Sequence, residues 1–228
     1  PASDGEVEDY AIPTQGLEMD YGDLPDSSVP VTPGYAMPGY PTTNSDDGAR
    51  HLILPANNPT LGSTVDDETE GHPSLDDDGD DTNGFPDDED GVSFSGPLMP
   101  GGATTITVSA APIAPGVLNG GRDFNGNGVL DDAGEQIATN QTIAAGTSVD
   151  LLVNVPLTAT QEITTYARFR FSTDIDLAPT GPASDGEVED YAIPTQGLEM
   201  DYGDLPDSSV PVTPGYAMPG YPTTNSDD

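Results

Sequence analysis

The sequence contains no cysteine and no tryptophan, and the absence of cysteine excludes a class of structure and of chemistry. Without cysteine there are no disulfide bonds, and no thiolate can act as nucleophile or metal ligand. No hydrophobic run reaches the roughly 18 residues that a membrane helix needs, so no membrane insertion is expected. The 24 prolines and 27 glycines, with no sustained 3.6-residue apolar periodicity, exclude long helices.

Positive charge is nearly absent, since four arginines and no lysine accompany 41 acidic residues, for a net charge of −37. This balance excludes nucleic acids and anionic membrane surfaces as natural partners. It also opposes compaction of the bare chain, so an acidic disordered polypeptide is one interpretation. The acidic residues are clustered, however. Clustered carboxylates favour divalent cations, which cancel their repulsion and order their loops.

The sequence repeats itself without a change: Pro1–Asp47 recurs as Pro182–Asp228, at an offset of 181 (182 − 1). This period is too long for a solenoid and suits an array of whole domains. We therefore expect the partners to be neighbouring repeats of the same chain or identical subunits in a filament. Strand addition by the first dozen residues is one way to join such subunits.

Strand-like patterns are concentrated between residues 91 and 193. They cover 92–95, 104–109, 148–155, 165–171 and 187–193. In the fourth of these, the strict alternation places Tyr166, Arg168 and Arg170 on one face and Ala167, Phe169 and Phe171 on the other. Short strands separated by Gly/Pro turns predict an all-β chain with an antiparallel β-sandwich of the Ig/fibronectin-like kind.

The domain organisation expected from these patterns has four parts. They are residues 1–12, the closing strand of a preceding sandwich; 13–90, a Pro/Gly-rich, acidic connector module; 91–194, the sandwich; and 195–228, identical to 14–47, the start of the next connector. Residues 29–41 favour extended, polyproline-like backbone, although their tyrosines can still pack on a sheet. Residues 48–54 are apolar enough for one more strand.

The sharpest motif is a calcium-type loop that begins at Asp123. Its predicted ligands are Asp123, Asn125, Asn127, Val129 through its carbonyl, Asp131 and Glu135. Oxygen ligands at alternate positions around a Gly at the sixth position describe such a loop. It departs from the EF-hand pattern because the twelfth position is Gly134 and no helices flank it. The alternative is an Asn-Gly-rich β-turn without metal.

A second acidic cluster fills residues 66–90, in which 13 of 25 residues are Asp or Glu. Its candidate ligands are Asp66, Glu68, Asp76, Asp78, Asp80, Asp81, Asp87, Asp88, Glu89 and Asp90, and Asp20, Asp23 and Asp26 are candidates to complete the same sites. This density of carboxylates favours several calcium ions per repeat over magnesium, with a solvated acidic loop as the alternative. His51 and His72 are expected to be hydrogen-bonded surface residues rather than zinc ligands.

The third motif is Asp185-Gly-Glu187-Val-Glu189-Asp190-Tyr191, with a copy at residues 4–10. With Ala167-Arg-Phe-Arg-Phe-Ser-Thr-Asp174 and the Asp123 loop before it, the chain resembles the GEVED-domain family of bacterial surface and secreted proteins. Gly120-Gly121-Arg122 departs from the aromatic residue that members often carry there. The resemblance implies a β-sandwich of an extracellular or cell-surface protein without enzyme activity, and we include Glu187, Glu189 and Asp190 among the metal candidates.

Two functions compete at this stage. The first is a structural repeat of a calcium-stabilised extracellular fibre, adhesin stalk or matrix filament. The second is a calcium-dependent adhesive module that binds carbohydrate or a partner protein, for which Tyr35, Tyr40 and Phe85 are the aromatic candidates. Catalysis is not expected, because the chain lacks a Ser-His-Asp signature, a nucleophile elbow and a phosphate loop.

Overall fold

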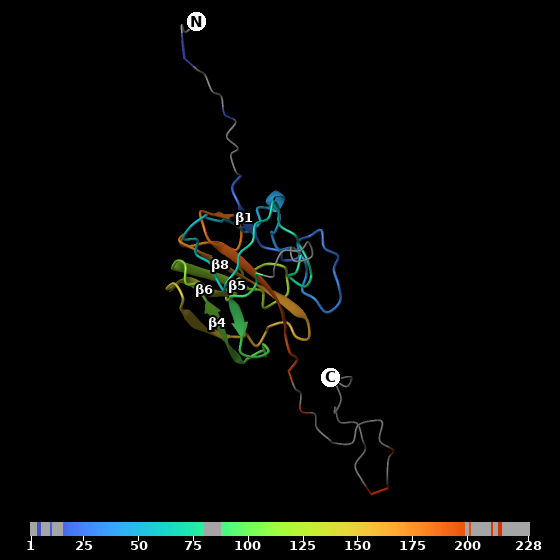
Figure 1. Ribbon diagram of the computed structural model, residues 1–228. Coiled ribbons are helices and arrows are strands. Elements are labelled where there is room, and N and C mark those ends of the chain that lie inside the picture. The colour runs from blue at the N-terminus through green and yellow to red at the C-terminus, as the bar shows by residue number, and fades with distance from the viewer. Residues whose placement is uncertain are drawn as a thin grey trace. The chain divides into compact units, whose positions relative to one another are not determined.

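The structure, a computed structural model, describes residues 4, 5, 10, 16–79, 88–198, 201, 211, 214 and 215. The chain divides into two compact units, Pro1–Gln196 and Gly197–Asp228. All the strands and the single short helix of the described residues belong to the first unit (Figure 1). That helix is the 3-10 turn η1 (Asn44–Asp46), and none of the described helices is long and apolar enough to cross a membrane.

Two antiparallel sheets enclose the main hydrophobic core. One has the order β10 (Glu187–Pro194), β8 (Thr164–Ser172), β5 (Gly116–Arg122) and β6 (Gln136–Ile143). The other has the order β3 (Val92–Phe94), β4 (Ala103–Ser109) and β7 (Ser148–Asn154). Phe169 and Phe171 of the first sheet belong to the same buried cluster as Ile106 and Val108 of the second. The all-β class with antiparallel sheets is therefore confirmed, and the arrangement is consistent with a β-sandwich.

The strands predicted from the sequence patterns are present as β3, β4, β7, β8 and β10, but β5 and β6 were not predicted. The strand β5 contains three glycines, a residue that is depleted in strands. Two of them are required by close packing. A Cβ on Gly116 would lie 2.6 Å from the Phe171 ring, and one on Gly121 would lie 2.7 Å from the carbonyl oxygen of Leu130.

Residues 16–79 form a third layer, which we call the connector layer. It contributes β1 (Met19–Tyr21) and β2 (Arg50–Leu52), which pair antiparallel, while β2 pairs in parallel with β9 (Pro182–Ala183). The predicted strand in 48–54 is thus present. Tyr40 packs edge-to-face on Tyr166 with ring centroids 5.3 Å apart, inside a small second core.

The connector layer buries the outer face of β8, which carries Tyr166, Arg168 and Arg170 as the alternation predicted. All three side chains are at most 1% exposed, although a strand face rich in arginine usually lies in water. Tyr166 donates its hydroxyl to the carbonyl of Leu75, at 2.9 Å. The segment therefore packs on the sandwich as part of the same compact unit.

Residues 16–196 also span one sequence period, because Gly197 repeats Gly16 at the offset of 181. The last backbone hydrogen bonds of the unit are those donated by Thr195 and Gln196, to Ile163 and Leu98. The expected strand 1–12 and most of 195–228 lie outside the described residues.

Candidate metal sites

The acidic motif on β10 fastens the connector layer to the sandwich. Asp190 receives two hydrogen bonds from the Arg168 guanidinium, both at 2.7 Å. Its Oδ2 also accepts the backbone N–H groups of Asp23 and Leu24, at 2.9 and 3.2 Å. One carboxylate therefore joins β8, β10 and the connector layer, and charge-assisted, bidentate bonds of this kind are the strongest hydrogen bonds in proteins.

The two glutamates of the motif hold backbone groups in the same way. Glu187 accepts the N–H of Leu61 at 2.5 Å, and Glu189 accepts the N–H of Gly91 at 2.9 Å. Glu189 also accepts the hydroxyl of Tyr191, at 3.0 Å. The motif therefore fixes both ends of the segment that leads from the connector layer into the sandwich.

The glycine of the motif has its own structural reason. Gly186 has φ +101°, and a Cβ there would lie 1.9 Å from the carbonyl oxygen of Phe171. Its N–H and C=O groups bond to the side-chain amide of Asn58, each at 3.0 Å. Only glycine combines this backbone conformation with this approach.

Arg170 is held by neutral acceptors rather than by a carboxylate. Its guanidinium donates to the carbonyl groups of Ala178, Thr180 and Gly181 and, at 3.0 Å, to Nε2 of His51. His51 is 0% exposed, so the expectation that it lies on the surface is wrong. Burial and the neighbouring Arg170 lower the pKa of His51 well below its usual value, which keeps the ring neutral and Nε2 an acceptor.

The loop that follows Asp123 is closed by its own side chains. Asp123 accepts the N–H groups of Asn125, Gly126 and Gly128 at 2.5–3.0 Å and the hydroxyl of Tyr40 at 2.6 Å. Asp123 is 0% exposed. The carboxylate thus shapes the turn and ties it to the connector layer.

Two further acidic residues complete this loop. The amides of Asn125 and Asn127 both donate to Oδ2 of Asp132, at 3.0 and 2.8 Å. Glu135 accepts the N–H of Phe124 and the amide of Asn125 through Oε1, whereas its buried Oε2 has no partner. Burial, with the charge of Asp123, raises the pKa of Glu135. Side-chain oxygens from both Asn residues, Asp132 and Glu135 can therefore turn to one cation.

Sequence reasoning chose Asp131 for this loop and missed Asp132. Asp131 instead lines a cavity, and Val129 is exposed. Behind the loop, Arg122 is fully buried and donates to the hydroxyl of Thr165 at 2.7 Å. Burial lowers the pKa of Arg122 to about 9, while nearby Asp123 opposes that shift.

A second group of carboxylates is buried between the connector layer and the sandwich. We call it the carboxylate cluster, and it consists of Asp20, Asp66, Glu68, Asp88, Glu187 and Glu189. All of these but Asp66 are at most 9% exposed. Oδ2 of Asp20 accepts the N–H of Val188 at 2.6 Å, and Oε2 of Glu68 accepts the N–H of Tyr21 at 2.8 Å. The cluster thus gathers residues that are far apart in the sequence.

The carboxylates of the cluster act on one another's protonation. Burial, and then the charge of Asp20, raises the pKa of Glu68 to about 12. Burial, Glu189 and Asp20 raise the pKa of Glu187 well above its usual range. Burial, with Asp90 and Asp88, raises the pKa of Glu189 to about 8. Burial is the largest cause of each shift, and the neighbouring carboxylates add to it.

Other predicted ligands have local roles. Asp23 holds the N–H of Gly79, Asp26 caps the turn at Ser28, and Asp90 holds Ser63. The remaining described candidates lie outside both groups: exposed Asp76, which accepts the hydroxyl of Tyr35, exposed Asp78, and half-buried Glu89. Asp80, Asp81 and Asp87 lie outside the described residues.

Two buried or half-buried aspartates were missed. Asp77 accepts the N–H of Ala192 at 2.8 Å, and burial raises the pKa of Asp77 to about 7. Asp185 accepts the N–H and hydroxyl groups of Thr173 and the hydroxyl of Ser172. Asp185 belongs to the acidic motif, and its place directly before Gly186 was the available signal in the sequence.

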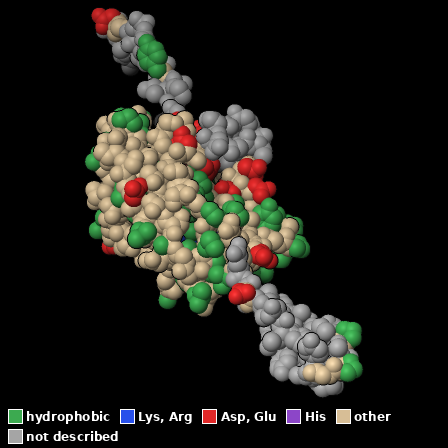
Figure 2. Space-filling model, turned by 90° about the horizontal axis from the view of Figure 1, so that it is seen from below, with side chains coloured by type: hydrophobic (Ala, Val, Ile, Leu, Met, Phe, Trp, Pro, Cys, Tyr) green, Lys and Arg blue, Asp and Glu red, His purple; other side chains and the backbone are tan. Residues whose placement is uncertain are grey.

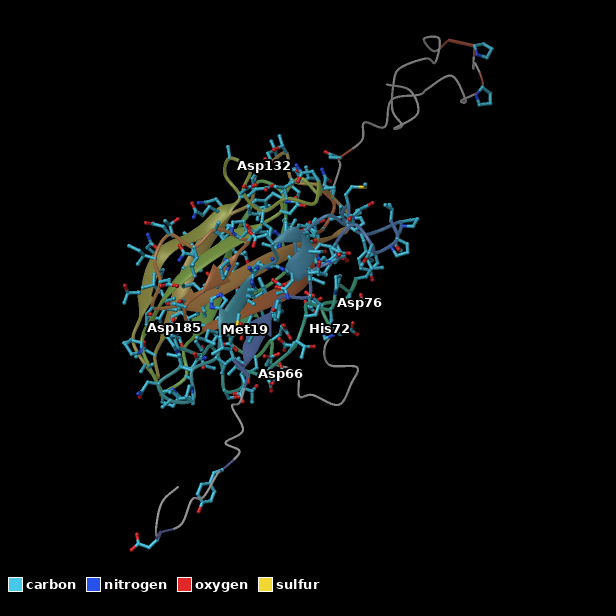
Figure 3. All side chains as sticks on the ribbon, turned by 90° about the horizontal axis from the view of Figure 1, so that it is seen from above. Met19, Asp66, His72, Asp76, Asp132 and Asp185 are labelled. Carbon is cyan, nitrogen blue, oxygen red and sulfur yellow. The ribbon has the colours of Figure 1, made fainter. Side chains whose placement is uncertain are left out.

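The two acidic groups are separate. Asp132 of the loop and Asp66 of the cluster lie on opposite sides of the unit in Figure 3. On the face shown in Figure 2, acidic side chains gather toward one side and basic side chains are almost absent, as expected from the burial of three of the four arginines. Among residues 16–79 and 88–198, no three Asp, Glu or His side chains are already placed to coordinate a metal ion. Either group would need its oxygens to turn inward.

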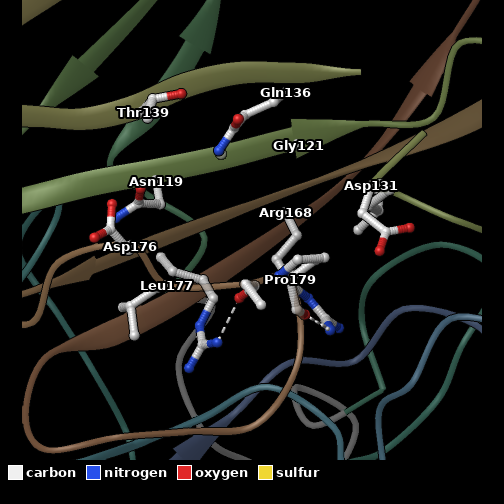
Figure 4. A pocket seen from close by; sticks show the side chains of 13 residues that line it. Asn119, Gly121, Asp131, Gln136, Thr139, Arg168, Asp176, Leu177 and Pro179 are labelled. Carbon is white, nitrogen blue, oxygen red and sulfur yellow. Dashed lines mark hydrogen bonds between the residues drawn. The ribbon is translucent and has the colours of Figure 1, made fainter. Parts of the chain in front are cut away.

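A cavity of about 370 Å³ lies over the outer face of β5 and β8 (Figure 4). Its floor includes Gly120, Gly121 and Arg168, and Asn119 and Asp176 stand at one end. Asn119 is 3% exposed, and its Nδ2 has no hydrogen-bond partner. The cavity therefore offers one unused amide donor in a polar wall.

The comparisons with known proteins agree with the motifs. Residues 122–194, from the end of β5 through β10, match the family model described as the GEVED domain. No curated protein and no solved structure matches the chain. The matched region contains the Asp123 loop, the arginines of β8 and the acidic motif of β10. Residues 122–194 of this chain are therefore a GEVED domain, as the resemblance implied.

Proposed function

We propose that this chain is a structural repeat unit of an extracellular fibre, stalk or matrix filament, stiffened by bound calcium. The observation that carries the proposal is that the strands of the described residues all lie within residues 16–196, which is one sequence period. A unit whose fold and period coincide is suited to addition end to end.

The calcium part of the proposal rests on the loop that begins at Asp123. It presents Asn125, Asn127, Asp132 and Glu135 on one tight turn, and a carboxylate oxygen of Glu135 is buried without a partner. Calcium prefers six to eight such oxygen ligands. Binding there would replace the amide–carboxylate hydrogen bonds by bonds to the ion and stiffen the turn that touches the connector layer through Tyr40.

The proposal predicts the shape of an array. A protein of four successive 181-residue units should be rod-like in calcium by small-angle X-ray scattering and should become shorter and more flexible in excess chelator. A maximum dimension that does not change with calcium, or that is already that of a flexible string, contradicts it. The proposal includes an extracellular location and no enzyme activity.

Adhesion is the second candidate function, and the cavity over β5 is the observation that favours it. The unused amide of Asn119 and the neighbouring Gln136 and Thr139 can donate to or accept from sugar hydroxyls. Tyr40, one of the aromatic candidates, is 1% exposed and so cannot serve as a stacking platform. A glycan-array screen with and without calcium, with Asn119→Ala as the comparison, distinguishes this candidate from a purely structural unit.

A further inference from the structure

We propose that the carboxylate cluster is a second cation site, in which one divalent ion joins the connector layer to the sandwich. The inference takes the identity of the ion, calcium, from the proposed function. It uses no residue of the Asp123 loop, so the two sites can fail separately.

The first argument is the way in which the carboxylates are held. Glu187 and Glu68 each bond a backbone N–H through Oε2, which fixes the side chain without using Oε1. Oε1 of both residues is buried and has no hydrogen-bond partner. Glu187 itself is 0% exposed. Two preoriented carboxylates thus retain one unused oxygen each, which is what an oxygen-preferring cation requires.

The second argument is that the members of the cluster interact with one another. The negative charge of Asp20 contributes to the raised pKa of both Glu68 and Glu187, and the charge of Asp88 contributes to that of Glu187. Asp88 accepts the N–H of Asp66 at 3.1 Å, and the charge of Asp66 adds to the raised pKa of Glu68. Residues from β1, from the segment before β3 and from β10 therefore surround one common region.

The third argument is charge balance. An ionised carboxylate that is buried without a partner costs several kcal/mol, so each must be protonated or paired with a cation. Arg170 acts on Asp20, but its guanidinium is occupied by carbonyl groups and His51. Arg168 is used by Asp190. A divalent ion neutralises two carboxylates at once, and several acidic ligands favour calcium over magnesium.

The position of the site gives the ion a particular task. Asp20, Asp66 and Glu68 belong to the connector layer, whereas Glu187 and Glu189 belong to the sandwich sheet. An ion shared between them would hold the two layers together. Its loss would loosen the contact between the connector layer and the sandwich.

The test uses the full chain, freed of metal with a chelator and titrated with Ca²⁺ by calorimetry. Four proteins are compared: the wild type, Glu187→Gln, Glu135→Gln and the control Asp150→Asn, which removes one charge from an exposed carboxylate on β7. Glutamine at 187 still accepts the Leu61 N–H but lacks the charge. We expect Glu187→Gln to bind one ion fewer than wild type, and Asp150→Asn to bind as wild type does.

Stability supplies a second readout. In chelator, Glu187→Gln should melt at a higher temperature than wild type because it removes a buried carboxyl group that the metal-free fold must protonate, and calcium should raise its Tm less. Glu68→Gln should behave in the same way, which guards against a folding defect in one variant. Unchanged calcium stoichiometry in both variants overturns the cluster as a site. If only Glu135→Gln binds one ion fewer, the Asp123 loop is a calcium site and the carboxylate cluster is not. If only Glu187→Gln binds one ion fewer, the cluster is a calcium site and the loop is not.

Discussion

Arg168 and Asp190 form a buried, bidentate ion pair on neighbouring strands, with both hydrogen bonds at 2.7 Å and side chains at most 1% exposed. The carboxylate of Asp190 also holds two backbone N–H groups of the connector layer, and Nη1 of Arg168 donates to the carbonyl of Pro41. The pair therefore lies at the junction of the two layers, and its loss should affect their association.

Replacing Asp190 by Asn should lower the free energy of unfolding by about 3–5 kcal/mol, the cost of leaving one charge of a buried pair uncompensated. Urea unfolding followed by circular dichroism measures this. The matched control is Asp47→Asn, which removes the exposed partner of Arg50 and should cost under about 1 kcal/mol. Equal losses in the two variants would contradict the role assigned to Asp190.

A protein of residues 16–196 should fold as one cooperative unit, whereas residues 88–196 alone should not. The shorter protein exposes the outer face of β8, with Tyr166 and two arginines that are buried at 0–1% exposure in the full unit. Limited proteolysis and circular dichroism compare the two. A shorter protein that resists protease as well as the longer one would show that the connector layer is only a linker.

The loop site can be tested inside its own turn. Glu135→Gln keeps the acceptor for the Phe124 N–H but removes the charge, so it should weaken calcium binding at the loop by tenfold or more. Asp131→Asn lies in the same loop but faces the cavity, and it should leave binding unchanged. Terbium luminescence sensitised by Tyr40, whose hydroxyl lies 2.6 Å from Asp123, reports on this site. A larger effect of Asp131→Asn would restore the ligand set predicted from the sequence.

The stability of the metal-free protein should fall as the pH rises from about 6.5 to 8 and should level off for these groups above that. Burial raises the pKa of Asp77 to about 7 and of Glu189 to about 8, far above the value of about 4 in an unfolded chain. In this window the folded state still holds protons that the unfolded state has already released, and the difference disappears for each group above its folded pKa. The unfolding free energy therefore declines with pH, by up to about 1.4 kcal/mol per group and pH unit.

Two comparisons check the sign of this change in unfolding free energy with pH. Calcium should flatten or reverse this slope, because it binds the ionised carboxylates. His51 acts in the opposite direction, since its pKa is lowered on folding, and its contribution is lost only below about pH 6.5. Chemical denaturation at several pH values, in chelator and in calcium, gives both slopes. A metal-free protein that becomes more stable between about pH 6.5 and 8 would contradict the burial of unpaired carboxylates.

The strands with β-branched or aromatic alternation were predictable because period-2 patterns depend only on local sequence. The strand β5 was not, since its glycines are set by the Phe171 ring and the Leu130 carbonyl, which are distant in the chain. The alternation of β8 placed Arg168 and Arg170 on one face, but it did not show that residues 16–79 would bury that face. Tertiary packing decides such cases.

The candidate sites show the same limit. A spacing rule chose Asp131, whereas the turn directs Asp132 toward the Asn125 and Asn127 amides. Composition identified the acidic run at 66–90, yet of the described residues in that run only Asp66, Glu68 and Asp88 join Glu187 in the cluster. Which carboxylates meet depends on how the connector layer folds back, and no local pattern in the sequence carries that information.

The measurement that tests the central claim most directly is the thermal unfolding of residues 16–196 by calorimetry, in excess calcium and in excess chelator. If calcium neutralises the buried carboxylates and fixes the Asp123 loop, Tm should rise steeply with calcium concentration, because the ion binds the folded state and not the unfolded one. A Tm that is the same in calcium and in chelator would contradict the account.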